Sequence, residues 1–235
     1  MALTVIKNWD KKTWLSSKDY IKLFNNFLTK KIKLNSQSKI LDIGCGRGKI
    51  LGNLSAKLRF KNKPIGIDIT NHKDKDKRIR FKKINALTFF LNNKHKFDLI
   101  LIKQTIHLLN LKEIIKLLDL SINNLSKKGK ILIFSLDTNQ SELPTFKLMK
   151  KKLLVSLKRD KRILKLITKL YLHKKSKFTF KVNITKKKYS QMIRNRYMST
   201  LLPLTTKQLS SGAKEIDLNY PDKIKFKDKL ICIIL

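Results

Sequence analysis

The sequence has little cysteine and no long apolar run, and both absences exclude whole classes of protein. The two cysteines, Cys45 and Cys232, have no ligand-like spacing to each other or to the four histidines, which excludes a disulfide framework and a zinc site. The longest apolar candidate, residues 97–109, is interrupted by Asp98 and Lys103, so we expect no membrane span. The first residues contain no charged segment followed by an apolar one, so we expect no secretory signal and a cytoplasmic location.

Acidic residues are also scarce, and the chain carries a formal net charge of +39 from 55 basic and 16 acidic residues. Such an excess favours an anionic partner, because clustered basic side chains attract phosphate groups. The basic residues are nevertheless spread along the whole chain, with the highest density at residues 147–188, and few aromatic residues lie among them for base stacking. Two interpretations of this stretch stay open: a solvated face, or a surface that binds an anionic ligand or RNA.

Glycine is rare as well, and three of the seven glycines fall within five residues, at Gly44, Gly46 and Gly48. They follow an apolar run at residues 40–43 that predicts a buried strand, and they precede a predicted helix at residues 49–58. A turn this sharp, with its backbone against a ligand, requires positive φ angles and no Cβ atom. An ordinary strand-to-helix turn is the alternative, and the glycines alone do not separate it from a nucleotide site.

Further apolar runs predict buried strands that alternate with helical segments. These runs span residues 64–69, 79–84, 97–102 and 130–136. Strands that alternate with helices form a parallel, doubly wound α/β sheet, and ligands bind such a sheet outside the carboxyl ends of its strands. The residues that this arrangement places around one crevice are Gly44, Gly46, Asp68, Asn85, Lys103 and Gln104.

Asp68 ends the second predicted strand and is the acidic residue of this crevice. It follows the glycines at close to the offset of about 20 residues at which an acidic group meets ribose hydroxyls in a βαβ nucleotide fold. A carboxylate there can accept two hydroxyl hydrogen bonds. The alternative is a loop aspartate that caps the next element.

Taken together, these residues resemble the class I S-adenosylmethionine-dependent methyltransferases, over roughly residues 38–137. The motifs that carry the resemblance are the glycine motif 41–48, the acidic strand end 66–68, Asn85-Ala86, the fourth-strand motif 97–100 and the turn 125–130 before the fifth strand. The resemblance implies a Rossmann-like, seven-stranded, mostly parallel sheet with an antiparallel last strand. It also implies a helical lid insertion after the fifth strand, as in small-molecule members of the family.

The resemblance further implies which residues bind the cofactor, S-adenosyl-L-methionine. The glycine-turn backbone would lie against its methionine part, with Asp42 near the ammonium group, and Asp68 would bind the ribose. Asn85 would accept from the adenine amino group, and Lys103 would line the pocket beside the sulfonium. The full set is Asp42, Gly44, Cys45, Gly46, Asp68, Ile69, Asn85, Ala86, Lys103 and Gln104.

Two residues are candidates for a catalytic role. His107 lies four residues beyond the end of the fourth strand, where the family often places groups that face the substrate, and it is our candidate base or orienting group. A histidine packed on the following helix is the alternative. Tyr20 belongs to an amphipathic helix near the N-terminus, and it would face the acceptor only if this part of the chain forms a lid.

Residues 138–222 hold what the cofactor motifs do not explain. We expect a basic helix at about 142–172 and an edge strand or hairpin at 177–184. Thr185 can cap a helix that carries residues 189–201, and residues 205–208 resemble a capping box that opens another helix. Arg194, Arg196 and Tyr197 are candidate substrate-binding residues, because an arginine on a lid helix can bind a carboxylate in bidentate geometry. The alternative is that these arginines pair with acidic residues of the protein.

The sequence thus predicts four parts. They are an N-terminal helical cap (1–37), a cofactor-binding core (38–137), a substrate lid insertion (138–222) and two closing antiparallel strands around Lys227-Asp228 (223–235). The leading hypothesis is a methyltransferase for a small acceptor, with an anionic acceptor as one form of it. The alternatives are an RNA or protein methyltransferase that docks through 147–188, and a cofactor-binding module without catalysis. Nucleic acid is therefore a less favoured partner, no membrane partner is expected, and either a monomer or a homodimer is compatible with the sequence.

Overall fold

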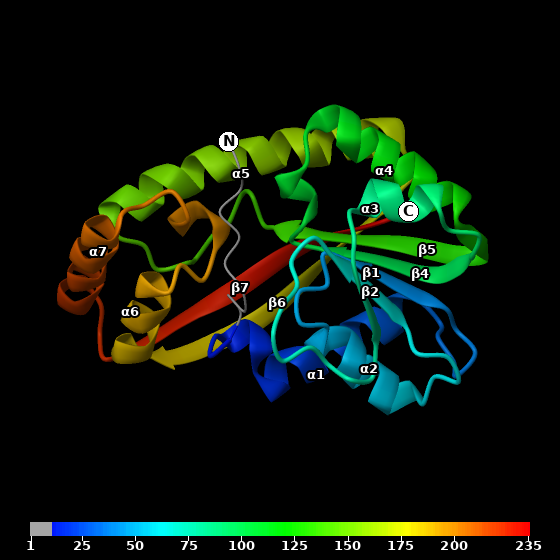
Figure 1. Cartoon of the computed structure of the whole chain (residues 1–235). Helices are drawn as coiled ribbons and strands as arrows, with labels where there is room; N and C mark the ends of the chain where they lie inside the picture. The colour runs from blue at the N-terminus through cyan, green and yellow to red at the C-terminus, as the bar shows by residue number, and fades with distance from the viewer. Residues whose placement is uncertain (1–10) are drawn as a thin grey trace.

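The sheet of the computed structural model, which describes residues 11–235, has seven strands in the order β3-β2-β1-β4-β5-β7-β6 (Figure 1). The strands are β1 (Ile40–Ile43), β2 (Ile65–Asp68), β3 (Arg80–Lys83), β4 (Phe97–Lys103), β5 (Leu125–Leu136), β6 (Lys174–Thr185) and β7 (Lys223–Ile234). Strands β3, β2, β1, β4 and β5 pair in parallel, whereas β7 runs antiparallel to both β5 and β6. The predicted fold class is confirmed.

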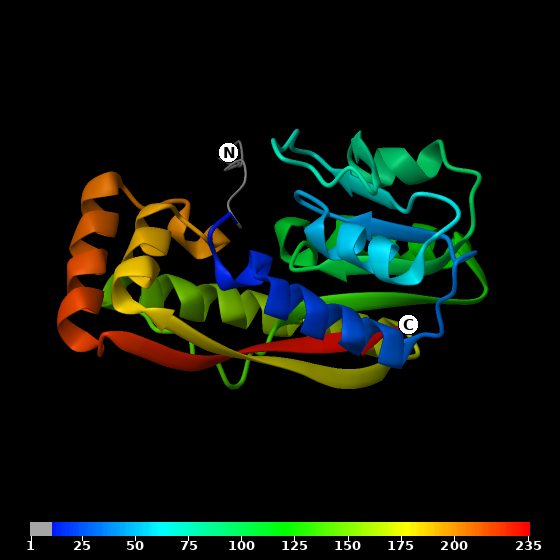
Figure 2. The same cartoon turned by 90° about the horizontal axis from the view of Figure 1, so that it is seen from below.

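Helices cover both faces of the sheet and one of its ends. They are α1 (Lys18–Lys31), α2 (Lys49–Leu58), α3 (Ala86–Leu91), α4 (Leu111–Asn123), α5 (Lys147–Leu170), α6 (Lys186–Arg194) and α7 (Thr206–Asn219). Helices α1 and α2 lie on one face and α3, α4 and α5 on the other, while α6 and α7 pack at the far ends of the long strands β6 and β7 (Figures 1 and 2). Three short 3-10 helices, η1 (Trp14–Ser16), η2 (Ile106–Leu108) and η3 (Ser199–Leu201), connect these elements. No helix within residues 11–235 has the length and apolar character needed to span a membrane.

Side-chain caps set the starts of several helices. The Ser17 hydroxyl accepts a hydrogen bond from the backbone N–H of Tyr20, as the sequence predicts for α1. The predicted capping box at the start of α7 is also present, because Thr205 and Gln208 each accept a hydrogen bond from the other's backbone N–H. These caps satisfy backbone donors that the first helical turn leaves unpaired.

The structure corrects three sequence-based boundaries. The two closing strands predicted around Lys227-Asp228 are one continuous strand, β7, because Asp228 is a buried residue rather than part of a turn. Strand β5 begins at Leu125, so the turn predicted at 126–129 lies within an irregular part of that strand. The helix predicted to continue through Tyr197 ends at Arg194.

The predicted division into cap, core and lid needs one refinement. Strand β6, inside the predicted lid insertion 138–222, belongs to the central sheet as its edge strand. Residues 1–10 of the predicted N-terminal cap lie outside the described residues. The boundaries of the four parts stay a prediction.

Candidate active site

A cavity of about 420 Å³ opens at the carboxyl ends of β1, β2 and β4. One side of it consists of the predicted cofactor motifs, including Gly44, Asp68 and Asn85. The opposite side is formed by helix α5 and the segment 196–202. The predicted cofactor motifs and the predicted lid therefore border one cavity.

The glycine turn brings backbone rather than side chains to this cavity. The φ angles of Gly44, Gly46 and Gly48 are +72°, +55° and +70°, a region that residues with a Cβ atom rarely adopt. A Cβ atom on Gly44 would lie 2.1 Å from Oγ1 of Thr105, whereas one on Gly46 would meet no atom within 4 Å. Gly44 is thus required by both conformation and space, whereas the space beside Gly46 is open.

Asp68 is held at the cavity wall by the ends of β1 and β2. Its Oδ2 accepts a hydrogen bond from the Gly46 N–H at 2.9 Å, and its Oδ1 accepts one from the Thr70 N–H at 2.8 Å. The Nε2 atom of His72 lies 3.7 Å from Oδ1. Burial raises the pKa of Asp68, but these donors outweigh burial and lower the pKa below its ordinary value. Asp68 is therefore an ionised acceptor in a fixed orientation, which suits a ribose diol.

The adenine end predicted at Asn85 is less polar than the sequence suggests. The Oδ1 atom of Asn85 accepts a hydrogen bond from the Leu87 N–H at 2.8 Å and so caps helix α3. Its carbonyl has a second lone pair that can still accept a hydrogen bond. Ala86 and Ile69 lie on the same wall, and Ile69 is 51% exposed, which leaves an apolar surface for a flat ring.

The end of β4 carries a cation that points toward α1. The Lys103 ammonium donates to Oε1 of Gln104 at 2.9 Å, and it lies 5.3 Å from the ring centre of Tyr20 and 5.5 Å from that of Phe24. These rings stabilise the positive charge by cation–π attraction. Lys103 and Gln104 both line the cavity, but the ammonium is anchored at the aromatic side of the fold.

Asp42 lies within β1 and does not line the cavity. Cys45 and Gly46, in the glycine turn, do not line it either. Burial raises the pKa of Asp42 to about 7, and the nearby Lys103 opposes that rise. The Cys45 side chain points toward Gly66, where a Cβ atom would lie 2.8 Å from its sulfur. Of the predicted cofactor residues, those that line the cavity are Gly44, Asp68, Ile69, Asn85, Ala86, Lys103 and Gln104.

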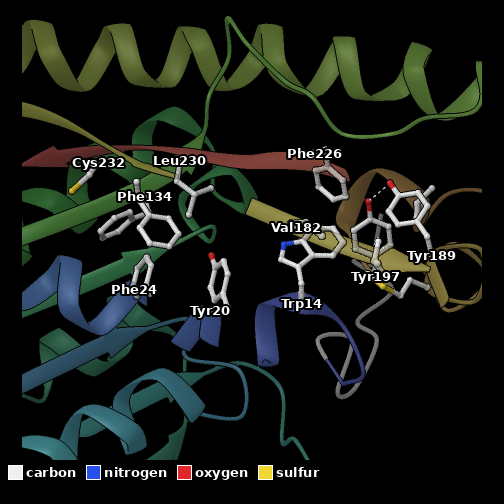
Figure 3. Packing of buried hydrophobic residues seen from close by; sticks show 14 of the residues in the cluster. Trp14, Tyr20, Phe24, Phe134, Val182, Tyr189, Tyr197, Phe226, Leu230 and Cys232 are labelled. Carbon is white, nitrogen blue, oxygen red and sulfur yellow. Dashed lines mark hydrogen bonds between the residues drawn. The ribbon is translucent and has the colours of Figure 1, made fainter. Parts of the chain in front are cut away.

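An aromatic group joins the N-terminal segment to the predicted lid (Figure 3). The rings of Tyr197 and Phe226 pack against Trp14 with centroids 5.3 and 5.2 Å from it. The Trp14 indole N–H donates to Oδ2 of Asp228 at 3.0 Å, and the hydroxyls of Tyr189 and Tyr197 are 2.9 Å apart. Trp14, Tyr197 and Asp228 all line the cavity, so this contact between distant segments shapes this part of its wall.

The two catalytic candidates differ in position. His107, on η2, lines the cavity, and its Nε2 lies 3.4 Å from the Ser199 hydroxyl. Burial lowers the pKa of His107 to about 4, and the positive charge of Arg159 is a second, smaller cause. At neutral pH the His107 ring is therefore uncharged. Tyr20 is fully buried and off the cavity wall, packed at ring-centre distances of 5.1–5.5 Å against Phe178 and Phe180. The structure brings His107 to the cavity and places Tyr20 in the core.

Of the three predicted substrate residues, two line the cavity and one does not. Arg194 lies off the cavity and 3.9 Å from Asp217, the intramolecular pairing given above as the alternative. Arg196 lines the cavity with a φ angle of +52°, and its guanidinium donates to the Leu204 carbonyl at 3.0 Å. Tyr197 lines the cavity next to it. Arg194 is thus corrected from a substrate residue to a surface ion pair, because α6 turns it away from the cavity.

Two buried acids on the cavity wall, Asp160 and Asp228, are absent from the sequence-based set. Both carry a recognisable signal, because each interrupts an apolar pattern. Asp160 occupies the apolar stripe of α5 between Leu157 and Ile163, and Asp228 occupies the inward-facing, period-two series of β7 that includes Phe226. A charged residue at a core position is costly unless it has a partner or a function.

A comparison with protein-family models identifies the family of this chain. The model of the methyltransferase domain family matches residues 34–196, which is well over half of the chain. The chain belongs to this methyltransferase family. With Asp68 and the glycine turn placed at one cavity, it is an S-adenosylmethionine-dependent enzyme. A comparison with curated proteins finds no match.

Solved structures support the same fold for the methyltransferase. The plantazolicin methyltransferase BpumL, in complex with a monoazolic desmethylPZN analogue and S-adenosylhomocysteine, is similar at a TM-score of 0.54 and 18% identity, over 97% of this chain and 86% of that one. A methyltransferase from Geobacter sulfurreducens in complex with S-adenosylhomocysteine is similar at a TM-score of 0.53 and 14% identity, over 93% and 91%. One from Thiobacillus denitrificans reaches 0.52 at 14% identity, over 90% of both chains.

Proposed function

We propose that the methyltransferase transfers the methyl group of S-adenosylmethionine to a small acceptor molecule that enters the cavity beside segment 196–202. The observation that carries this proposal is the shared cavity, whose cofactor wall and lid wall enclose about 420 Å³. A volume of this size suits a cofactor together with a small acceptor group. The BpumL complex supports the proposal, since a related fold there holds a desmethylPZN analogue.

The chain's residues fit the cofactor. Gly44 lines the cavity without a side chain, Asp68 presents an ionised carboxylate, and Ile69 and Ala86 present apolar surface. When bound, S-adenosylmethionine supplies an activated methyl group on a sulfonium. The protein therefore has to align the acceptor with that group and exclude water. Trp14, Tyr197 and the η3 segment close the acceptor side, and His107 can orient the acceptor through its uncharged ring.

The structure does not favour an anionic acceptor, because the two arginines that suggested one already have partners within the protein. Arg194 lies off the cavity beside Asp217, and the Arg196 guanidinium already donates to a backbone carbonyl. The Lys-rich stretch 147–188 divides between α5, on one face of the sheet, and β6, at its edge. A small acceptor is therefore favoured over docking of RNA along one continuous basic surface.

Calorimetry with S-adenosylhomocysteine tests the cofactor site without turnover. The native protein should bind it, and Asp68→Ala should weaken binding at least ten-fold, about 1.4 kcal/mol, because the fixed carboxylate is lost. Asp222→Ala is the matched control, since Asp222 is an exposed acid paired with Lys186 and should leave the affinity unchanged. Absence of binding by the native protein would contradict the cofactor assignment.

Methyl transfer to separate acceptor pools then tests the acceptor class. The release of S-adenosylhomocysteine is measured with a small-molecule extract, with total RNA and with a protein fraction. We expect release with the small-molecule extract. Release only with RNA or protein would favour the docking alternative, and tight cofactor binding without release in any pool would favour a module without catalysis.

A further inference from the structure

Asp160 is a buried acid on the cavity wall, and its carboxylate oxygen Oδ1 has no hydrogen-bond donor among residues 11–235. Asp160 projects from the middle of α5, is 4% exposed and lines the cavity. A buried carboxylate that lacks partners destabilises a fold, so its presence at a cavity indicates that a ligand completes its interactions.

The basic residue that precedes Asp160 in the chain does not neutralise its charge. Arg159 is the adjacent residue, but its guanidinium donates to the Leu109 carbonyl at 3.0 Å and forms no ion pair with Asp160. Burial raises the pKa of Asp160 to about 6, and Arg159 only partly opposes that rise. Because this pKa is still below 7, Asp160 is mainly ionised at neutral pH, and no ion pair to it is present among the described residues.

A second unpaired polar atom lies on the same cavity. The Thr200 hydroxyl of η3 is buried and makes no hydrogen bond within the described part of the chain. Thr200 lines the cavity, as does Ser156, one turn before Asp160 on α5. Packing between α5 and η3 brings these two elements together. One carboxylate and two hydroxyls thus border the acceptor side, a set of acceptors suited to the N–H groups of an ammonium or guanidinium.

Ligands of other charge fit this wall poorly. An anionic group would meet the Asp160 carboxylate, and like charges at close range repel each other most strongly where water is excluded. A neutral apolar group would bury the carboxylate further without a partner. A positively charged nitrogen instead supplies both the charge and the donors that Asp160 lacks.

We propose that Asp160 binds a positively charged nitrogen of the acceptor, so that the substrate class of this methyltransferase is a small amine or guanidine. This inference rests on the proposed function, because it assigns the acceptor side of the same cavity. Asp160 acts here as a substrate-binding residue, with Thr200 as a second acceptor for the same group. The apolar cavity residues Trp14 and Leu143 would contact the body of the acceptor.

Calorimetry with matched ligands tests this proposal on the full chain saturated with S-adenosylhomocysteine. The probes have benzyl, phenethyl or isopentyl bodies, each with an amine, a hydroxyl or a carboxylate at the same position. We expect at least one amine to bind ten-fold or more tightly than its hydroxyl and carboxylate counterparts. If no amine exceeds its counterparts, the proposal is overturned, and this result does not depend on any variant.

The variant Asp160→Asn then locates the effect. It keeps the shape of the side chain but removes the charge, and it should weaken amine binding ten-fold or more while the matching alcohol binds as before. Asp222→Asn removes a charge at an exposed position and should leave amine binding unchanged. Equal amine affinity in native protein and Asp160→Asn would overturn the assignment to Asp160. Failure of the native protein to bind S-adenosylhomocysteine would contradict the proposed function, whereas cofactor binding without amine preference would contradict this inference alone.

Discussion

The unpaired carboxylate of Asp160 predicts a pH-dependent stability that can be measured without any substrate. Burial raises its pKa from 3.8 to about 6 in the folded protein. At about 1.4 kcal/mol per pKa unit, the ionised form destabilises the fold by about 3 kcal/mol above pH 7. Because the folded-state pKa is raised, the penalty is present above pH 6 and disappears below the unfolded value near pH 4.

The variant Asp160→Asn removes this titration. Urea unfolding of native protein and variant should therefore give a stability difference that shifts in favour of the variant by about 2–3 kcal/mol between pH 4 and pH 8. Any constant cost of the buried amide cancels in this comparison, since it does not depend on pH. A difference that stays the same from pH 4 to pH 8 would refute the reasoning, because it would show that Asp160 is solvated or paired in the folded state.

Two further predictions concern the other side of the cavity. Trp14→Phe removes the indole donor of the buried Asp228 carboxylate and should lower the free energy of unfolding by about 1–3 kcal/mol. A double-mutant cycle with Asp228→Ala isolates the hydrogen bond, and additive losses would show that it contributes nothing. The His107 ring should stay uncharged from pH 5.5 to 8, because burial and the charge of Arg159 lower its pKa to about 4. An NMR titration of His107 with a midpoint above 6 would contradict that assignment.

Asp68 and Asp160 line the same cavity but differ in their hydrogen-bond donors and in the direction of their pKa shifts. Asp68 has its donors within the protein, and its pKa is lowered despite burial. Asp160 has no such donors at Oδ1, and its pKa is raised. Asp68 thus has its donors before any ligand binds, whereas we expect a bound cation to stabilise Asp160. We expect a ligand-binding residue such as Asp160 to lower the stability of the unliganded fold, because it is retained for binding rather than for stability.

The cavity wall that carries the glycine turn could be predicted from the sequence because its signals are local. A strand, three glycines and a helix follow one another within 20 residues, and Asp68 ends the next strand. Parallel strands place their carboxyl ends at one edge, so topology alone gathers Gly44, Asp68 and Asn85. The positive φ angles of the glycine turn confirm the expected conformation.

Side-chain direction on the acceptor side could not be predicted in the same way. Arg194 and Arg196 are two residues apart, yet the end of α6 turns one toward Asp217 and the other to the cavity. Asp228 suggested a turn, because acidic residues are rare within strands, but a donor from Trp14, 214 positions away, makes its burial tolerable. Contacts over such separations depend on how the elements pack and leave no local pattern.

The sequence by itself determined the succession of most strands and helices and the glycine turn, since periodicity and turn chemistry act over short stretches, and its motifs resemble those of the methyltransferase family. Only the tertiary structure decided which charged residues line the cavity. Arg194 and Tyr20, which the sequence suggested for the site, do not line the cavity, whereas Asp160 and Asp228 do. The physical reason is burial: whether a charge needs a partner depends on the elements packed around it, and these come from distant parts of the chain.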